Sequence, residues 1–190
     1  MTRLPTLLLH PDAAPDQHPI QPHIETIVVP LDGSRTAEEV VPVAHALAKR
    51  LSVPLQLVHV VDGSHLAALE EWEQALEARQ AGADQYIRGI TRRLTDDGLT
   101  ATGIVMVGDP AAKIADFLDG RPATLVVMAD RGHARRAGWT LGSVTEKAIS
   151  SIHCPLLVIR SEDAREGAQP VRSSEDGASP IQTWGNAKQR

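Results

Sequence analysis

The sequence predicts an α/β protein with a doubly wound, five-stranded parallel sheet. Between residues 24 and 160, short apolar runs alternate with stretches of helical periodicity, and this alternation is typical of βαβ units. Aromatic residues make up only 3% of the chain and hydrophobic residues 42%. The core must therefore consist mainly of Val, Ile, Leu and Ala, as in buried parallel strands. A length of 190 residues fits one domain with tails.

The expected strands and helices alternate regularly along the chain. We expect strands at 27–32, 55–61, 102–107, 124–128 and 155–159. We expect helices at 35–51, 65–97, 110–118 and 142–151. In a doubly wound sheet we expect the strand order 3-2-1-4-5, counted from the strand at 27–32.

Individual residues predict where the helices begin or bend. Pro42 should kink the first helix or move its start. Gly82 and Gly89 are candidate breaks in the second helix. Asp109-Pro110 suits the start of the third helix, and Ser143-Val144-Thr145-Glu146 is a capping-box pattern at the start of the fourth.

The two ends of the chain differ in composition from its middle. Residues 1–23 contain several prolines and show no period, which predicts a flexible arm. Residues 161–190 are rich in Ser, Glu, Asp, Gly, Gln and Arg, which predicts a disordered tail. The folded domain is therefore expected at 24–160.

Composition excludes several classes of function. The formal net charge is −5 and no basic stripe is present, so we expect no nucleic-acid partner. No apolar run approaches the ~18–20 residues that cross a bilayer, and the run at 6–9 is too short for a signal peptide. We therefore expect no membrane partner and a cytoplasmic location. Cys154 is the only cysteine, so no intramolecular disulfide can form.

The strongest functional pattern begins where the fourth strand ends. Ala129-Asp130-Arg131-Gly132 is followed, after nine residues, by Gly142-Ser143. Ligands of doubly wound sheets bind beyond the carboxyl ends of the strands, and this segment leads from such an end to a helix N-terminus. Unpaired backbone N–H groups and the helix dipole favour an anion there, and the hydroxyls of Ser143 and Thr145 can add hydrogen bonds.

Several segments, in this order, resemble the universal stress protein family. The family carries Gly-x2-Gly-x9-Gly-Ser/Thr where this chain has Ala129 and then Gly132, Gly142 and Ser143. The resemblance covers about 24–160 and leaves out both tails. The other matching segments are Val29–Ser34, His59–Val61, Gly108–Pro110, Leu141–Lys147 and His153–Ile159.

The resemblance implies a Rossmann-like domain that binds an adenine nucleotide: ATP first, or ADP, AMP or cyclic AMP, alone or with Mg²⁺. It implies that adenine and ribose lie beside Pro30, Leu31, Asp32 and Val60. It implies that ribose and α-phosphate lie beside Met128, Ala129, Arg131 and Gly132. It implies that the outer phosphates lie beside Gly142, Ser143, Val144 and Thr145.

The same residues also have plainer interpretations. Asp32 suits a turn before Gly33-Ser34, Gly142-Ser143 suits an ordinary helix start, and Arg131 suits a solvated loop. The methyl group of Ala129 can crowd a ligand, or strain the backbone if the site needs a positive φ.

These observations leave several functional hypotheses open. The leading one is a nucleotide-binding regulatory protein of the stress response with little or no catalysis. A slow ATPase is the alternative, although the Gly-x4-Gly-Lys-Ser/Thr loop of efficient NTPases is absent. A dinucleotide binder would need Gly-x-Gly-x-x-Gly after the first strand, which is also absent. An interaction module with an empty pocket is the remaining hypothesis.

Strand chemistry also predicts an assembly. The last strand, Leu156 to Ile159, is apolar, and such a strand needs cover if it lies at a sheet edge. Pairing with its two-fold mate would provide that cover, and the family resemblance implies the same contact. We therefore expect a homodimer through this strand.

Overall fold

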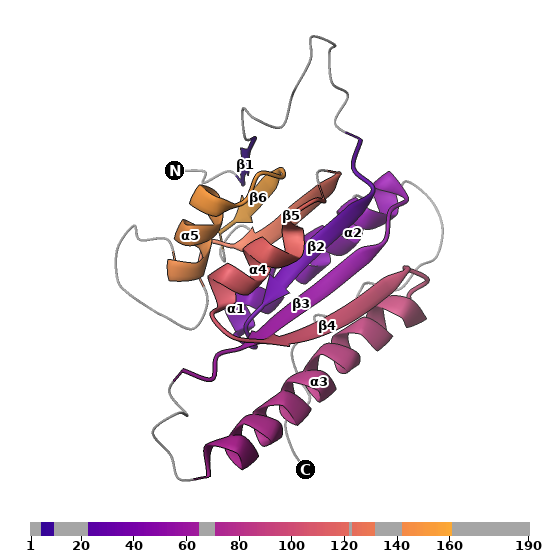
Figure 1. Ribbon diagram of the computed structural model, residues 1–190. Helices are drawn as coiled ribbons and strands as arrows, with labels where there is room; N and C mark the ends of the chain where they lie inside the picture. Colours follow the sequence, from indigo (N-terminus) through magenta and orange to yellow (C-terminus); the bar gives the residue numbers. More distant parts are fainter. Residues whose placement is uncertain (1–4, 10–22, 65–70, 122, 132–141, 161–190) are drawn as a thin grey trace.

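A six-stranded sheet in the order β1-β6-β5-β2-β3-β4 organises the molecule (Figure 1). The computed structural model describes residues 5–9, 23–64, 71–121, 123–131 and 142–160. The strands are β1 (Thr6–Leu8), β2 (Thr26–Leu31), β3 (Leu55–Val61), β4 (Ala101–Val107), β5 (Thr124–Ala129) and β6 (Leu156–Ile159). The helices are α1 (Arg35–Glu38), α2 (Val41–Leu51), α3 (Trp72–Asp96), α4 (Pro110–Leu118) and α5 (Ser143–Ser151).

Helices cover both faces of the sheet, as the α/β fold class requires. Side chains of α2 and α3 pack on one face with Val29, Leu57 and Val127. Side chains of α4 and α5 pack on the other face with Val28 and Val126. Neighbouring strand residues thus point to opposite faces, and both faces are apolar because both are buried. The expected mixture of parallel strands and crossover helices is confirmed.

The expected strand count and order are wrong because the sheet has an additional strand. β1 pairs antiparallel with β6, with Leu7 opposite Leu157. The sequence predicts that Leu156 to Ile159 form the edge of the sheet, but β1 occupies that edge instead. Beyond β1, the strands follow one another as β6-β5-β2-β3-β4. A three-residue strand among prolines carries almost no periodic signal, and its pairing partner lies far away in sequence.

The same finding corrects the expected flexible arm at 1–23 in one place. Thr6–Leu8 form β1, and Leu8 packs against the apolar cluster under α4 and α5. Of the expected arm, residues 1–4 and 10–22 lie outside the described residues. The predicted tail at 161–190 also lies outside them. Within the described ranges, no helix combines the length and apolarity that a membrane span needs.

Two helix predictions meet different outcomes. Pro42 lies in the first turn of α2, and α1 ends before it, so the single helix expected at 35–51 is divided. Proline has no N–H to donate and therefore favours a helix start. By contrast, α3 continues through Gly82 and Gly89. Its buried face packs on β4, and this packing outweighs the roughly 1 kcal/mol cost of each glycine.

Candidate functional site

The sheet opens between β2 and β5. Their pairing ends at Val28 and Val126, whereas β2 stays paired with β3 as far as Leu31 and β5 with β6 as far as Ala129. Pro30 lies in the part of β2 beyond this pairing and has no N–H for a strand ladder. The chain runs from β2 to β3 on one side and from β5 to β6 on the other. The opening is therefore the point of reversal at which such sheets bind ligands.

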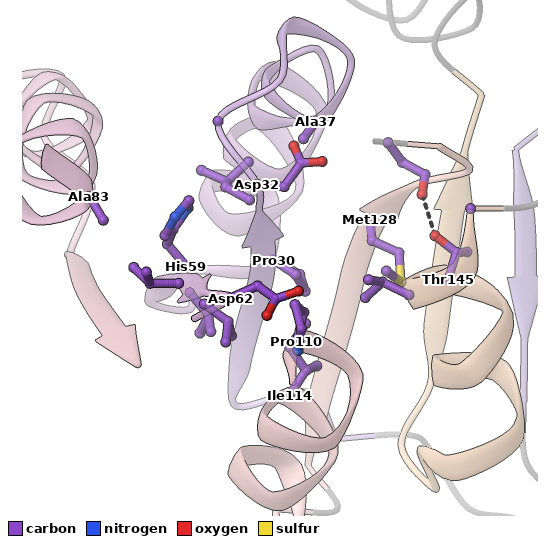
Figure 2. Close-up of a pocket in the computed structure, with 18 of the residues that line it drawn as sticks. Pro30, Asp32, Ala37, His59, Asp62, Ala83, Pro110, Ile114, Met128 and Thr145 are labelled. Carbon is purple, nitrogen blue, oxygen red and sulfur yellow. Dashed lines mark hydrogen bonds between the residues drawn. The ribbon is translucent and has the colours of Figure 1, made fainter. Parts of the chain in front are cut away.

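A cavity of about 640 Å³ occupies this opening, a size typical of small-molecule sites. Figure 2 shows Met128 and Thr145 on one side of it and His59 and Ala83 on the other. The predicted site residues that line the cavity are Pro30, Leu31, Asp32, Val60, Met128, Ala129, Arg131, Gly142, Ser143, Val144 and Thr145. Gly132, the remaining predicted residue, lies outside the described residues.

Helix α5 begins at this cavity, and no described side chain caps it. The N–H of Glu146 makes the first intrahelical bond, to the Gly142 oxygen at 2.9 Å, and the N–H of Gly142 donates to the Asp130 oxygen at 2.8 Å. The amides of residues 143–145 precede the first intrahelical donor, so the helix itself offers them no acceptor. All three residues line the cavity. An anion in the cavity would therefore meet a cluster of donors and the positive end of the helix dipole.

The predicted capping box at the start of α5 is wrong. The N-cap is Gly142 and Ser143 is the first helical residue, so the hydroxyl of Ser143 is one position too late to cap. Two other helices are capped, since Ser34 accepts from Ala37 at 3.1 Å at α1 and Asp109 accepts from Ala112 at 2.9 Å at α4, whereas α2 and α3 also lack a side-chain cap. The start of α5 differs from α1 and α4 because a glycine stands where their capping side chain stands, and it borders the cavity.

Thr145 joins α5 to the end of β5. Its hydroxyl donates to the backbone oxygen of Ala129 at 3.0 Å, and both residues are buried (Figure 2). The hydroxyl proton is therefore used inside the protein, and only the Thr145 amide remains as a donor toward the cavity. The expected hydroxyl hydrogen bond from this residue to a ligand does not fit this geometry.

Asp32 combines the two roles that the sequence leaves open. One of its carboxylate oxygens accepts from the N–H of Ser34 at 2.9 Å, which closes a turn around Gly33. Gly33 has φ +82°, a conformation that favours glycine. Asp32 also lines the cavity. The turn thus fixes the carboxylate at the end of β2, where a ligand can reach the residue.

Arg131 brings a positive charge to the cavity. Its Nε lies 3.3 Å from Oδ2 of Asp130, and the arginine side chain is only 29% exposed. The plainer interpretation of Arg131 as part of a solvated loop does not describe this side chain fully, because it pairs with Asp130 and lines the cavity.

Sequence reasoning missed the helix α3 side of the cavity. Arg79, Gly82, Ala83 and Tyr86 line it from α3, and Pro110 and Ile114 line it from α4. The α3 residues have the spacing i, i+3, i+4 and i+7, which puts them on one face of a helix. That spacing is visible in the sequence, but nothing in the sequence shows that this face borders the strand ends.

A family model described as the universal stress protein family matches residues 23–160. The chain belongs to the universal stress protein family. Universal stress protein MJ0531 of Methanocaldococcus jannaschii is 29% identical over 137 residues, which span 70% of this chain and 81% of that protein.

Two solved structures show the same architecture as this universal stress protein. UspA from Lactobacillus plantarum aligns with a TM-score of 0.64 and 26% identity, over 73% of this chain and 98% of that one. A universal stress protein solved in complex with cAMP aligns with a TM-score of 0.52 and 21% identity, over 73% of this chain and 98% of that one. At that identity, the second likeness shows the fold alone.

Ala129 is the point at which this universal stress protein departs from the glycine motif. Ser52 is the only non-glycine residue with positive φ among those described, so the backbone at Ala129 is not strained. Ala129 is 6% exposed and lies at the end of β5 with its methyl group in the core cluster on the α2 side. A residue with a methyl group thus fits this position without special backbone geometry.

Proposed function

We propose that this universal stress protein binds an adenine nucleotide in the cavity between β2 and β5, with ATP as the expected ligand. Binding would serve a regulatory role in the stress response. The observation that carries this proposal is the start of α5, which no described side chain caps and whose residues 143–145 line a cavity at the switch point of the sheet. The likeness in fold to a universal stress protein solved with cAMP supports an adenine nucleotide as the occupant.

The backbone amides of residues 143–145 form the proposed phosphate seat, and its contribution to the binding free energy can be estimated. Hydrogen bonds to a charged group contribute roughly 1.5–3 kcal/mol each. Bonds from the amides of 143–145 would then contribute about 5–9 kcal/mol before the costs of binding. Micromolar affinity requires about 8 kcal/mol. Burial of the base against Pro30, Val60 and Met128, which line the cavity, adds apolar contact. Micromolar binding is therefore within reach.

Little or no hydrolysis forms part of the proposal. The phosphate seat consists of backbone amides, which bind and polarise an anion but do not transfer a proton. An ATPase activity that stays with the protein through purification and is lost in Gly142→Val would identify a slow ATPase instead.

The first test is direct. Freshly purified protein is denatured and any released nucleotide is identified, and isothermal titration then measures the affinity of the stripped protein for ATP, ADP, AMP and cyclic AMP. We expect release or binding of at least one adenine nucleotide at micromolar affinity. A stripped, folded protein that binds none of them would refute the proposal.

Gly142→Val tests where the phosphates bind. Gly142 has φ −63° and ψ 149°, which valine adopts readily, so the fold should persist. The added side chain would stand in front of the amides at 143–145 and should weaken ATP binding at least tenfold, as measured by titration. Gly142→Ala, with one methyl group, should weaken it less. Equal affinity in all three proteins would place the phosphates elsewhere.

The expected homodimer through the last strand remains a proposal, with one added condition. The edge of β6 is occupied by β1 of the same chain, so a dimer through Leu156 to Ile159 requires β1 to leave. We propose a homodimer only under that condition.

A further inference from the structure

Helix α3 forms a wall of the cavity that no expected nucleotide contact uses. The residues expected to hold the nucleotide come from β2, β3, β5, α5 and their adjoining turns. The cavity nevertheless extends to Arg79, Gly82, Ala83 and Tyr86 of α3. In Figure 2, Ala83 and His59 lie across the cavity from Met128.

Small residues keep this side of the cavity open. Gly82 and Ala83 stand between the two long side chains of the α3 wall. A Cβ built on Gly82 meets no atom within 4 Å. A ligand can therefore approach the α3 backbone closely at this turn.

Tyr86 brings a buried polar atom to this wall. Its hydroxyl is shielded from solvent and makes no hydrogen bond of good geometry with the described residues, although the carboxylate of Glu38 interacts with it. Its ring meets His59 edge to face, with centroids 5.8 Å apart and planes at 69°, so the hydroxyl is held in a defined place. A buried hydroxyl whose hydrogen-bonding capacity is not fully used is unfavourable, so such an atom beside a cavity favours a ligand that offers it a hydrogen bond.

The charges around Tyr86 indicate what that partner is. Burial, then the charge of Glu38 and the interaction of its carboxylate with the hydroxyl, and then the charge of Asp32 raise the pKa of the phenol, so it stays protonated. If the phenol donates toward Glu38, its oxygen can still accept a hydrogen bond from a ligand. Carboxylates nearby repel phosphate and attract hydrogen-bond donors. Ribose hydroxyls and the amino group of adenine are such donors, whereas phosphates fit the distant amides of α5.

We propose that Tyr86 is a specificity-determining residue whose hydroxyl hydrogen-bonds the ribose–adenine half of the bound nucleotide. This proposal rests on the proposed nucleotide binding and adds the α3 wall to it. The nucleoside half then spans from Pro30 and Val60 across to α3, and the phosphates extend toward α5.

Tyr86 is the only tyrosine of the chain, so it can be observed alone. Protein that carries 3-fluorotyrosine gives one protein ¹⁹F resonance. Adenosine and ATP should both shift this resonance, and inorganic triphosphate should not. A resonance that stays in place while titration shows ATP bound would overturn the proposal, as would a shift with triphosphate and none with adenosine.

Tyr86→Phe removes only the hydroxyl. We expect this variant to bind both ATP and adenosine about tenfold more weakly than the wild type, because the same hydrogen bond is lost in each. Compared with ATP, 2′-deoxy-ATP lacks the 2′-hydroxyl donor, and ITP carries an oxygen in place of the amino group of adenine. A change in packing alone would not alter the preference among these three nucleotides. If wild type and Tyr86→Phe bind 2′-deoxy-ATP equally well, the hydroxyl contacts the ribose. If they bind ITP equally well, it contacts the adenine amino group. Equal affinities of variant and wild type for ATP would overturn the proposal.

Gly82→Leu and Gly89→Leu form a matched steric pair. Both glycines are exposed positions of α3 at which a Cβ meets no atom within 4 Å, and only Gly82 lines the cavity. Leucine should favour the helix at both positions. We expect weaker ATP binding with Gly82→Leu and unchanged binding with Gly89→Leu. Equal binding by the two variants would show that the ligand does not reach α3.

The two proposals fail in distinguishable ways. If the wild type binds no adenine nucleotide, both are refuted. If the wild type binds ATP and Gly142→Val weakens it, but neither the Tyr86 resonance nor Tyr86→Phe responds, the nucleotide site stands and the role of Tyr86 is refuted.

Discussion

The hydroxyl of Thr145 donates a hydrogen bond to the backbone oxygen of Ala129 at 3.0 Å, inside the protein. This bond ties the first turn of α5 to the end of β5, the two elements that border the phosphate seat. The side chain therefore positions the amides instead of contacting the ligand. Its contribution to binding should come through the placement of α5.

Thr145→Val tests this role. Valine has nearly the same shape but leaves the Ala129 oxygen without its donor, so the free energy of unfolding should fall by about 1–3 kcal/mol. Urea denaturation measures this loss. Ser150→Ala is the control, since its exposed hydroxyl bonds the Glu146 oxygen at 3.3 Å within the same helix and should contribute little. Equal stabilities of Thr145→Val and the wild type would contradict the assignment.

His45 is a second residue whose surroundings affect its protonation. Its Nε2 lies 2.7 Å from Oδ2 of Asp97, and Nζ of Lys49 lies at the same distance from that oxygen. Burial and the charge of Lys49 lower the pKa of His45, and the opposing effect of Asp97 is smaller. A hydrogen bond from Lys49 is the main cause that lowers the pKa of Asp97. The folded protein therefore resists protonation of His45 more than the unfolded chain does.

This shift predicts a pH dependence of stability. Because the folded-state pKa of His45 lies below 6.5, its unfolded value, the unfolded chain binds the proton first. Stability should then fall as the pH drops below about 6.5, until the lowered pKa is reached. Urea denaturation at several pH values measures the slope. His45→Gln should flatten it, whereas His23→Gln, at a side chain that is 83% exposed, should not. An unchanged slope in His45→Gln would contradict the prediction.

At the scale of elements, α3 illustrates how packing decides what local propensity leaves open. Gly82 and Gly89 are candidate breaks on propensity alone, yet the helix continues because Ile87, Ile90 and Leu94 are buried. The same packing positions Tyr86 beside the cavity. The alternation of strands and helices was readable from the sequence, since apolar periodicity is a local property. The contact between α3 and the strand ends was not readable from the sequence, because it joins segments that lie far apart in the chain.

Gly103 on β4 permits this close contact. A Cβ at this position would overlap with Cγ2 of Ile87 and lie 2.8 Å from Oγ1 of Thr91. Gly103→Val should push α3 away from β4 and lower the free energy of unfolding by about 1–3 kcal/mol. Because Tyr86 adjoins Ile87, ATP affinity should fall as well, which titration measures. Gly89→Ala, where a Cβ meets no atom within 4 Å, should leave both properties intact or raise stability slightly. Wild-type stability in Gly103→Val would mean that α3 is not seated this closely.

For the whole molecule, the decisive feature is the edge of the sheet. β1 covers β6 through the pairs Thr6–Val158, Leu7–Leu157 and Leu8–Leu156. Leu8 packs on the core, whereas Leu7 is 54% exposed. A strand this short forms few hydrogen bonds, so it can be displaced more easily than the strands of the sheet interior. An uncovered β6 would present an apolar edge to a second copy of the chain.

Removal of residues 1–9 should therefore promote self-association. We expect a concentration-dependent rise in mass, measured by analytical ultracentrifugation, relative to the full chain. Leu8→Asp should have the same effect by releasing β1, and Leu7→Asp is its matched control because that side chain already faces solvent. Equal masses of the truncated and full-length proteins across micromolar concentrations would contradict a role for β1 as edge cover.

The sequence by itself determined the α/β class, the bounds of most strands and helices, and the glycine-spaced segment that leads into α5. These follow from periodicity, turn residues and short motifs, which act over a few neighbouring positions. Only the tertiary structure decided that β1 covers β6, that Gly142 and not Ser143 is the N-cap of α5, and that Tyr86 of α3 reaches the cavity. Each of these depends on contacts between distant segments, and their free energies are set by packing and pairing that no local pattern records.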